Sequence, residues 1–181
     1  TFIEYIFLNN LKKNNSHIEI EGETNLIEPT QKNQPVIFIS GHFANFELMS
    51  MEITKRNIQL ATIYRPLNNI FLNPLMEYLR KKYVCKNQIK KGINGVRETI
   101  EYIKKKYSIA LMIDQRVSEG EPIKLFNRYA KTTSIPAQLA KKYGCRIVPV
   151  YIERIEDLNF KLSFNNPNKS LFNMLRFLYI L

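Results

Sequence analysis

The residues most capable of chemistry are His42 and Glu47, which lie five positions apart in the stretch GHFANFE. A histidine held by a carboxylate is a common general base, because the carboxylate fixes the ring tautomer and raises the basicity of the other nitrogen. Within one continuous helix the two side chains would point about 140° apart, too far to share a hydrogen bond. We therefore expect His42 on a turn before a helix and Glu47 in the second helical turn, from where its carboxylate reaches back to the imidazole.

The spacing alone is a weak signal. The chain has 16 acidic residues and two histidines in 181 residues. At least one of the two histidines would therefore have an acid at this offset by chance about one time in six. His17, the other histidine, has Gly22 at the same offset and is expected to be a solvated residue. The candidate base therefore depends on the elements around it.

A buried strand is predicted directly before His42. Residues 36–40 read VIFIS, a continuous apolar run bounded by Pro35 and Gly41, which is typical of a strand covered on both faces. After His42, apolar residues recur with helical spacing from Phe43 to Ile53. His42 is therefore expected at a strand-to-helix junction.

Further strands and helices alternate along the chain. A helix is expected from Pro74, with Asn73 as its cap, and Gly144 is expected to close a later one. The remaining predicted elements are strands at 59–64, 108–113 and 146–151, the last in a hairpin with 159–164, helices at 96–103 and 136–143, and a long polar loop at 114–133. The pattern predicts an α/β fold: a single domain with a mostly parallel sheet flanked by helices on both faces.

In such sheets the ligand crevice lies at the carboxyl ends of the strands. His42, Arg65 and the pair Asp114 and Arg116 each follow a predicted strand, so one base and two arginines would face one cleft. Arg80, in the helix from residue 74, would join them. Taken singly, the arginines could equally be ordinary rim charges, and Asp114 could cap a turn.

Composition limits the class of protein. Residues 1–181 suit one domain, and 45% apolar residues are enough for a sizeable core. The net charge of +11 favours partners that carry phosphate or carboxylate groups, whether nucleic acid, anionic lipid or an acidic protein. Cys85 and Cys145 form no metal-ligand or disulfide pattern, so we expect neither a metal site nor a disulfide, and a reducing compartment.

The sequence lacks the motifs that are typical of several reaction classes. The sequence has no glycine-rich phosphate loop, no GxSxG elbow and no candidate nucleophilic cysteine. A histidine base without a protein nucleophile implies direct attack by a substrate hydroxyl, and no cofactor is expected. RNA-binding signatures are also missing, so nucleic acid is not an expected partner.

The two ends of the sequence suggest a piece of a longer protein. The chain begins with Thr1 inside a predicted helix and ends in the apolar segment 171–181, either a packing helix or one lying at a membrane interface. No run of 18 or more apolar residues occurs, which predicts no membrane span within these residues.

Several sequence blocks, in order and with matching spacing, resemble one family. The chain is similar to the bacterial lipid A biosynthesis lauroyl/myristoyl acyltransferases, which belong to the glycerolipid acyltransferase-like group with an H-x4-D/E motif. The resemblance covers residues 18–164 and rests on IEIEGE at 18–23, ISGHFANFE at 39–47, YRP at 64–66 with Asn68, LR at 79–80, KG at 91–92, IDQ at 113–115, KTT at 131–133 and RIVP at 146–149.

The resemblance implies a specific reaction. A fatty acyl chain would pass from acyl carrier protein to a hydroxyl of a phosphorylated glycolipid, a lipid A precursor, in lipopolysaccharide biosynthesis. His42 would deprotonate that hydroxyl while Glu47 holds the imidazole. Arg80 would bind an acceptor phosphate or stabilise developing negative charge, and Asp114 would organise the site. The implied location is the cytoplasmic face of the bacterial inner membrane, with the protein peripheral or anchored through a segment absent from this chain.

Two other functions stay open at this point. The acceptor could be another hydroxyl, of a glycerolipid, an ornithine lipid or a sugar. Less in keeping with the motifs, the chain could be a non-catalytic domain that binds lipid or nucleic acid. Family members usually run to about 300 residues and carry tryptophan near the end, whereas this chain has no tryptophan and leaves the family pattern after Asn165.

Overall fold

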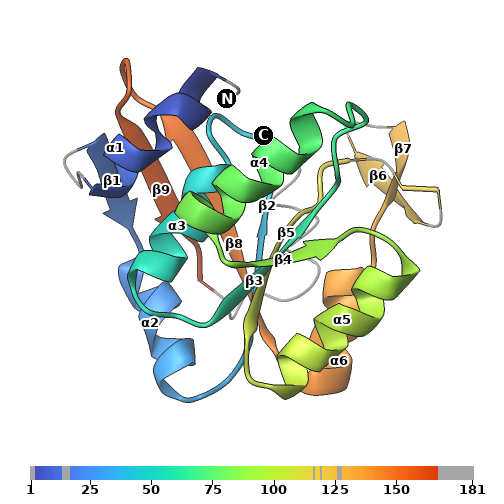
Figure 1. Ribbon diagram of the computed structural model, residues 1–181. Helices are drawn as coiled ribbons and strands as arrows, with labels where there is room; N and C mark the ends of the chain where they lie inside the picture. Colours follow the sequence, from blue (N-terminus) through green and yellow to red (C-terminus); the bar gives the residue numbers. More distant parts are fainter. Residues whose placement is uncertain (1–2, 14–16, 116, 119, 126–127, 167–181) are drawn as a thin grey trace.

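The computed structural model describes residues 3–13, 17–115, 117–118, 120–125 and 128–166 (Figure 1). Its helices are η1 (Ile3–Phe7, 3₁₀), α1 (Leu8–Lys13), α2 (Glu23–Gln31), α3 (Glu47–Lys55), α4 (Leu72–Leu79), the π-helical turn η3 (Arg80–Val84), α5 (Ile93–Lys104) and α6 (Ile135–Tyr143). Its strands are β1 (Ile18–Glu21), β2 (Val36–Ser40), β3 (Leu60–Tyr64), β4 (Asn87–Lys90), β5 (Ser108–Met112), β6 (Glu121–Leu125), β7 (Arg128–Thr132), β8 (Arg146–Arg154) and β9 (Phe160–Phe164).

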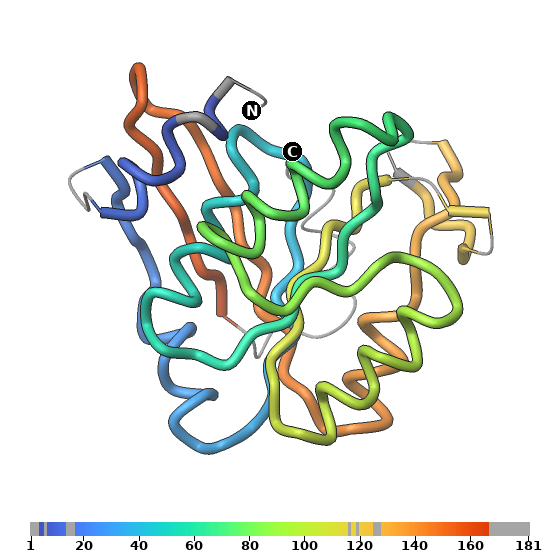
Figure 2. Tube along the Cα trace, in the orientation of Figure 1, coloured from blue at the N-terminus to red at the C-terminus, as the bar shows by residue number. Residues whose placement is uncertain are grey.

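A seven-stranded sheet forms the centre of the fold, in the order β1-β9-β8-β2-β5-β3-β4. Every neighbouring pair is parallel except β8 and β9, which form an antiparallel hairpin. Figure 2 shows β1, near the start of the chain, running beside β9, near its end. The expected fold class, a mostly parallel α/β sheet with helices on both faces, is confirmed.

Side chains of β2 explain why the sheet is covered on both faces. All five residues of this strand are buried, and successive side chains point to opposite faces. Val36 and Phe38 join a core layer with residues of α1, α2, α3 and α4, whereas Ile37 and Ile39 join a layer with residues of α5 and α6. A strand buried in this way is mainly apolar, and the hydroxyl of its one polar residue, Ser40, donates to the Val150 carbonyl. This composition is why VIFIS was readable from the sequence.

Several elements differ from their sequence prediction. The stretch 114–133, expected to be a loop, contains the β6-β7 hairpin, which its polar composition hid. Strands β1 and β4 and helix α2 were not predicted, since the strands are short and α2 contains Pro29. Asn73 is not a cap, because α4 begins at Leu72, and the preceding Asn69 side chain accepts hydrogen bonds from two backbone amides there.

The structure describes nothing of residues 171–181, so the expected apolar helix there lies outside the described residues. Within the described part, no helix is long and apolar enough to cross a membrane.

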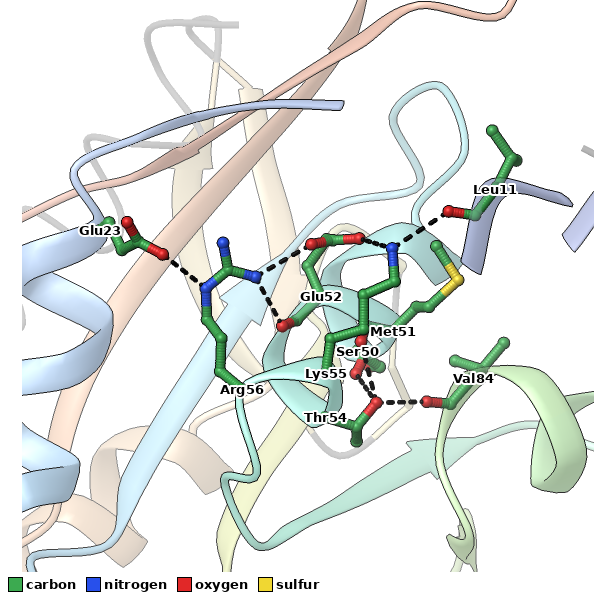
Figure 3. A network of polar contacts seen from close by, with 9 residues as sticks. All are labelled: Leu11, Glu23, Ser50, Met51, Glu52, Thr54, Lys55, Arg56 and Val84. Atoms are coloured by element: carbon green, nitrogen blue, oxygen red, sulfur yellow. Dashed lines mark hydrogen bonds and ion pairs between the residues drawn. The ribbon is translucent and has the colours of Figure 1, made fainter. Parts of the chain in front are cut away.

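The last turn of α3 is tied to three neighbouring elements by one polar network (Figure 3). The buried Glu52 carboxylate accepts hydrogen bonds from Lys55, at 2.6 Å, and from Arg56, at 2.9 Å. Lys55 also donates to the Leu11 carbonyl of α1, and Arg56 to the Glu23 carboxylate of α2. The Thr54 hydroxyl donates to the Val84 carbonyl of η3. These contacts hold the helix that follows His42.

We expect Glu52→Ala to lower the free energy of unfolding by about 3 kcal/mol, since the substitution removes the buried anion that Lys55 and Arg56 share. Urea denaturation measures the change. The matched control is Glu28→Ala, which breaks an exposed ion pair with Lys32 and should cost less than about 0.5 kcal/mol. Equal losses in the two variants would contradict the anchoring role of Glu52.

Candidate active site

Pairing between β2 and β5 brings His42 and Asp114 together. Ser40 lies opposite Met112 in this parallel pair, and the Ile113 amide donates to the Ser40 carbonyl. Two residues further along each strand, His42 therefore faces Asp114. The His42 ring nitrogen Nδ1 lies 2.7 Å from Oδ1 of Asp114, and the His42 backbone N–H donates to Oδ2 at 2.8 Å.

The ionisation state of the Asp114 carboxylate determines the tautomer of His42. Partial burial acts to raise the pKa of Asp114, but hydrogen bonds from the His42 ring and backbone outweigh it and lower that pKa. An ionised carboxylate only accepts hydrogen bonds, so Nδ1 carries the proton and Nε2 keeps its lone pair. The pKa of Asp114 is lower in the folded chain than in the unfolded chain. The ionised carboxylate therefore stabilises the fold above the unfolded pKa, and this stabilisation is lost as the pH falls through the folded pKa.

The free face of the His42 ring is open to a reactant. Its side chain is 36% exposed, and Nε2 lies 3.4 Å from the amide nitrogen of Gln115. The Phe46 ring packs edge-on against the imidazole, with centroids 4.7 Å apart. These contacts orient the imidazole while leaving Nε2 accessible, as a general base requires.

Glu47 occupies a different position from the one expected. It is the first residue of α3, not a residue of the second turn, and its carboxylate Oε1 accepts hydrogen bonds from Arg80 Nε, at 2.8 Å, and from the Tyr5 hydroxyl. Within the described part of the chain, no hydrogen bond joins Glu47 to His42. The predicted contact was wrong because the β2-β5 register brings Asp114 to the imidazole instead.

Arg80 is the centre of a second, buried cluster. Its Nε also donates to the Tyr5 hydroxyl at 3.2 Å, and its Cζ lies 5.9 Å from the Tyr5 ring centroid and 5.5 Å from that of Tyr64. Burial acts to lower the pKa of Arg80, but the charge of Glu47 and the hydrogen bonds outweigh it and raise that pKa. Burial, followed by the Glu47 charge, raises the pKa of Tyr5. The cluster therefore stays an ion pair with a neutral phenol.

One Arg80 nitrogen is left over. Nη1 is buried and has no hydrogen-bond partner among the described residues, and Arg80 lines the cavity described next. A guanidinium among the lining residues is suited to a negative charge that forms inside the cavity. A bulky surface phosphate suits it less, because the side chain is only 11% exposed.

A cavity of about 780 Å³ opens beside both clusters. It forms because the sheet divides: β3 and β5 pair only as far as Thr62 and Ala110, while β3 continues along β4 and β5 continues along β2. The two strand ends therefore separate, and their side chains line the gap. His42, Glu47, Arg80 and Gln115 are among its polar lining residues, and its apolar lining includes Ile63, Leu67, Val96, Leu111 and Ile135.

The structure brings together most of the residues selected from the sequence. His42, Glu47, Arg80 and Arg65 all line the cavity, and Arg65 is exposed at its rim. Asp114, expected to organise the site, contacts His42 directly. Arg116 lies outside the described residues.

Two side chains of the site were missed from the sequence. Tyr5 is 42 positions from Glu47, and no local pattern could connect them. Gln115 follows Asp114 directly and could have been suspected from its neighbour.

The described residues hold no group of three or more histidine, cysteine or acidic side chains able to bind a metal. Cys85 and Cys145 are free and buried, and burial raises the pKa of each thiol. Neither cysteine is suited to act as a nucleophile.

A family model described as "bacterial lipid A biosynthesis acyltransferase" matches residues 1–171 of the 181-residue chain. The chain belongs to this family. The resemblance inferred from the ordered sequence blocks is thereby confirmed, together with an acyltransferase activity in lipid A biosynthesis. A comparison with curated proteins found no match.

We expect the His42 ring to be protonated at Nδ1, and we expect Asp114→Asn to move the proton to Nε2. Both Asp114 oxygens accept hydrogen bonds from His42, whereas asparagine has one acceptor and turns an N–H₂ group towards the ring. The ¹⁵N shifts of the two ring nitrogens report the tautomer, and His17→Asn assigns the signals. Glu47→Gln is the control, and a tautomer change in that variant instead would contradict the geometry.

Proposed function

We propose that this acyltransferase moves a fatty acyl chain from acyl carrier protein to a hydroxyl of a phosphorylated glycolipid, a lipid A precursor, in lipopolysaccharide biosynthesis. The observation that carries the proposal is the His42–Asp114 pair beside a cavity that is lined in large part by apolar side chains. A base beside a space for an alkyl chain suits acyl transfer to a hydroxyl. We place the reaction at the cytoplasmic face of the bacterial inner membrane.

The chemistry follows from the unprotonated Nε2 of His42. Nε2 takes the proton of the acceptor hydroxyl as its oxygen attacks the thioester carbonyl, and a tetrahedral intermediate forms. Collapse of the intermediate breaks the carbon–sulfur bond, and the imidazolium returns its proton to the leaving thiolate. Asp114 stabilises the imidazolium between these two steps. The products are an ester and the free thiol of the carrier, so no protein nucleophile is needed.

Arg80 is assigned to the negative charge that develops in this reaction. The Arg80 guanidinium is held in place at a residue that lines the cavity, and one preorganised hydrogen bond of this kind lowers a barrier by about 3 kcal/mol. Glu47 and Tyr5 hold the guanidinium in place, so Glu47 acts through Arg80 and not through His42. Arg65, exposed at the rim, is better placed to meet an acceptor phosphate.

We expect His42→Ala to reduce acyl transfer by about a hundredfold or more, as is usual on loss of a general base. Transfer is measured from acyl carrier protein to a tetra-acylated lipid A precursor, and His17→Ala is the matched control, since its exposed ring contacts Asn159 away from the cavity. Transfer that survives His42→Ala would contradict the mechanism. Transfer only to a glycerolipid, ornithine lipid or sugar would contradict the acceptor.

We expect Val96→Trp to shift the accepted acyl chains to shorter lengths by filling part of the apolar wall. Val96 lines the cavity from α5 and is partly exposed, so the larger ring can be accommodated without disrupting the core. Competition among acyl carriers loaded with chains of different length measures the preference. Arg97→Trp is the control, since Arg97 does not line the cavity, and an unchanged preference in Val96→Trp would place the acyl chain elsewhere.

A further inference from the structure

Five large apolar side chains are exposed on α4 and the loop before it. We name Ile70, Phe71, Leu72, Leu75 and Tyr78 the α4 patch. Ile70 is 74% exposed and Phe71 85%, and the other three are between 43% and 56% exposed. Scattered exposed apolar residues are normal, but a contiguous group of this size marks an interaction surface.

Helix geometry collects three patch members on one stripe. Phe71, Leu75 and Tyr78 follow one another at spacings of four and three residues, which places them on the same face of the helix. Met76 lies on the other side, where it is buried against the sheet. Lys82 continues the stripe, with its ammonium 3.2 Å from the Tyr78 hydroxyl. An apolar face that ends in tyrosine and lysine is typical of a helix lying in a membrane interface.

The sequence around the patch is strongly basic. Residues 65–97 contain a single acidic residue, Glu77, whose carboxylate accepts hydrogen bonds from Tyr64 and Asn73 and pairs with Lys90. The same residues contain eight basic side chains: Arg65, Arg80, Lys81, Lys82, Lys86, Lys90, Lys91 and Arg97. All but Arg80 are exposed. Lys81 and Lys82 lie in η3, which follows α4 directly, and Lys90 pairs with Glu77 of α4. The charge beside the α4 patch is therefore complementary to anionic headgroups.

The α4 patch adjoins the mouth of the cavity. Residues from Arg65 to Asn68 line the cavity, and the chain then leads directly into Ile70. Ile93, at the start of α5, also lines the cavity and is 80% exposed. A lipid that leaves a bilayer beneath the patch would thus meet the cavity first at the Arg65 rim.

We propose that the α4 patch inserts into the headgroup boundary of an anionic lipid bilayer, with the surrounding lysines on the lipid phosphates. The inference rests on the proposed function in one respect, namely that the acceptor is a membrane lipid. Docking through the patch would turn the mouth of the cavity towards the bilayer that holds this lipid. A second copy of the chain is a poorer occupant, because it would bring the same cations against each other.

Vesicle flotation tests the proposal. The probe is vesicles of phosphatidylcholine with one third phosphatidylglycerol, compared with phosphatidylcholine alone. We expect the chain to bind the anionic vesicles, and Phe71→Glu with Leu75→Glu to weaken partitioning about tenfold or more, since two apolar contacts become anionic. The matched control, Ile155→Glu with Leu158→Glu, makes the same change at exposed apolar residues of the β8-β9 turn and should bind as the unaltered chain.

Several outcomes would overturn the proposal. These are no binding by the unaltered chain, equal binding by the α4 double variant, equal losses in both double variants, or binding to neutral vesicles as strong as to anionic ones. Sedimentation that shows a dimer lost in the α4 variant, without loss of vesicle binding, would assign the patch to a second copy instead. Circular dichroism and thermal melting establish that each variant is folded.

A parallel assay separates this proposal from the catalytic one. The α4 double variant should transfer acyl chains to a detergent-dispersed acceptor at the rate of the unaltered chain, since neither residue lines the cavity. His42→Ala should float with vesicles normally and transfer nothing. Flotation that depends on the patch in a chain without transferase activity would refute the proposed function and leave the docking surface standing.

Discussion

The site depends on the register of one strand pair, β2 with β5. Ser40 pairs with Met112, so His42 and Asp114, each two residues further along, face each other. Asp114 accepts hydrogen bonds from both the ring and the backbone of His42. A slip of one residue would turn the side chains of a strand to the opposite face. Because β2 is buried on both faces, the apolar packing that stabilises the fold also fixes the geometry of the base.

The two carboxylates of the site have different roles because of this register. Asp114, partly exposed and bonded to His42, keeps a lowered pKa and determines the tautomer. Glu47, buried in the first turn of α3, neutralises Arg80 beneath the cavity. A buried ion pair contributes little net stability, so the role of this pair is positional. Together with Tyr5, Glu47 holds the Arg80 guanidinium beside the cavity.

Access to the base comes from the division of the sheet. The backbone pairing between β3 and β5 ends at Thr62 and Ala110. Beyond this point the strands separate, and the cavity opens between them, lined by both polar and apolar side chains. The exposed apolar and basic surface of α4 lies beside the same opening. The base and the loop from Arg65 to Asn68 therefore line the same cavity, and that loop leads directly to α4.

Much of this protein was determined by local sequence. The apolar runs of β2, β3 and β5 and the glycine after α6 predicted their elements, and the ordered motif blocks identified the family. Local patterns could not reveal β1, β4, α2 or the β6-β7 hairpin, which are short or polar and depend on neighbours distant in the chain. The sequence also placed His42 and Asp114 at strand ends, but it paired His42 with Glu47, its neighbour in the motif. Only the tertiary structure decided that Asp114 holds the base and that Tyr5 and Arg80 hold Glu47, because strand register and helix packing, not sequence distance, set which side chains meet.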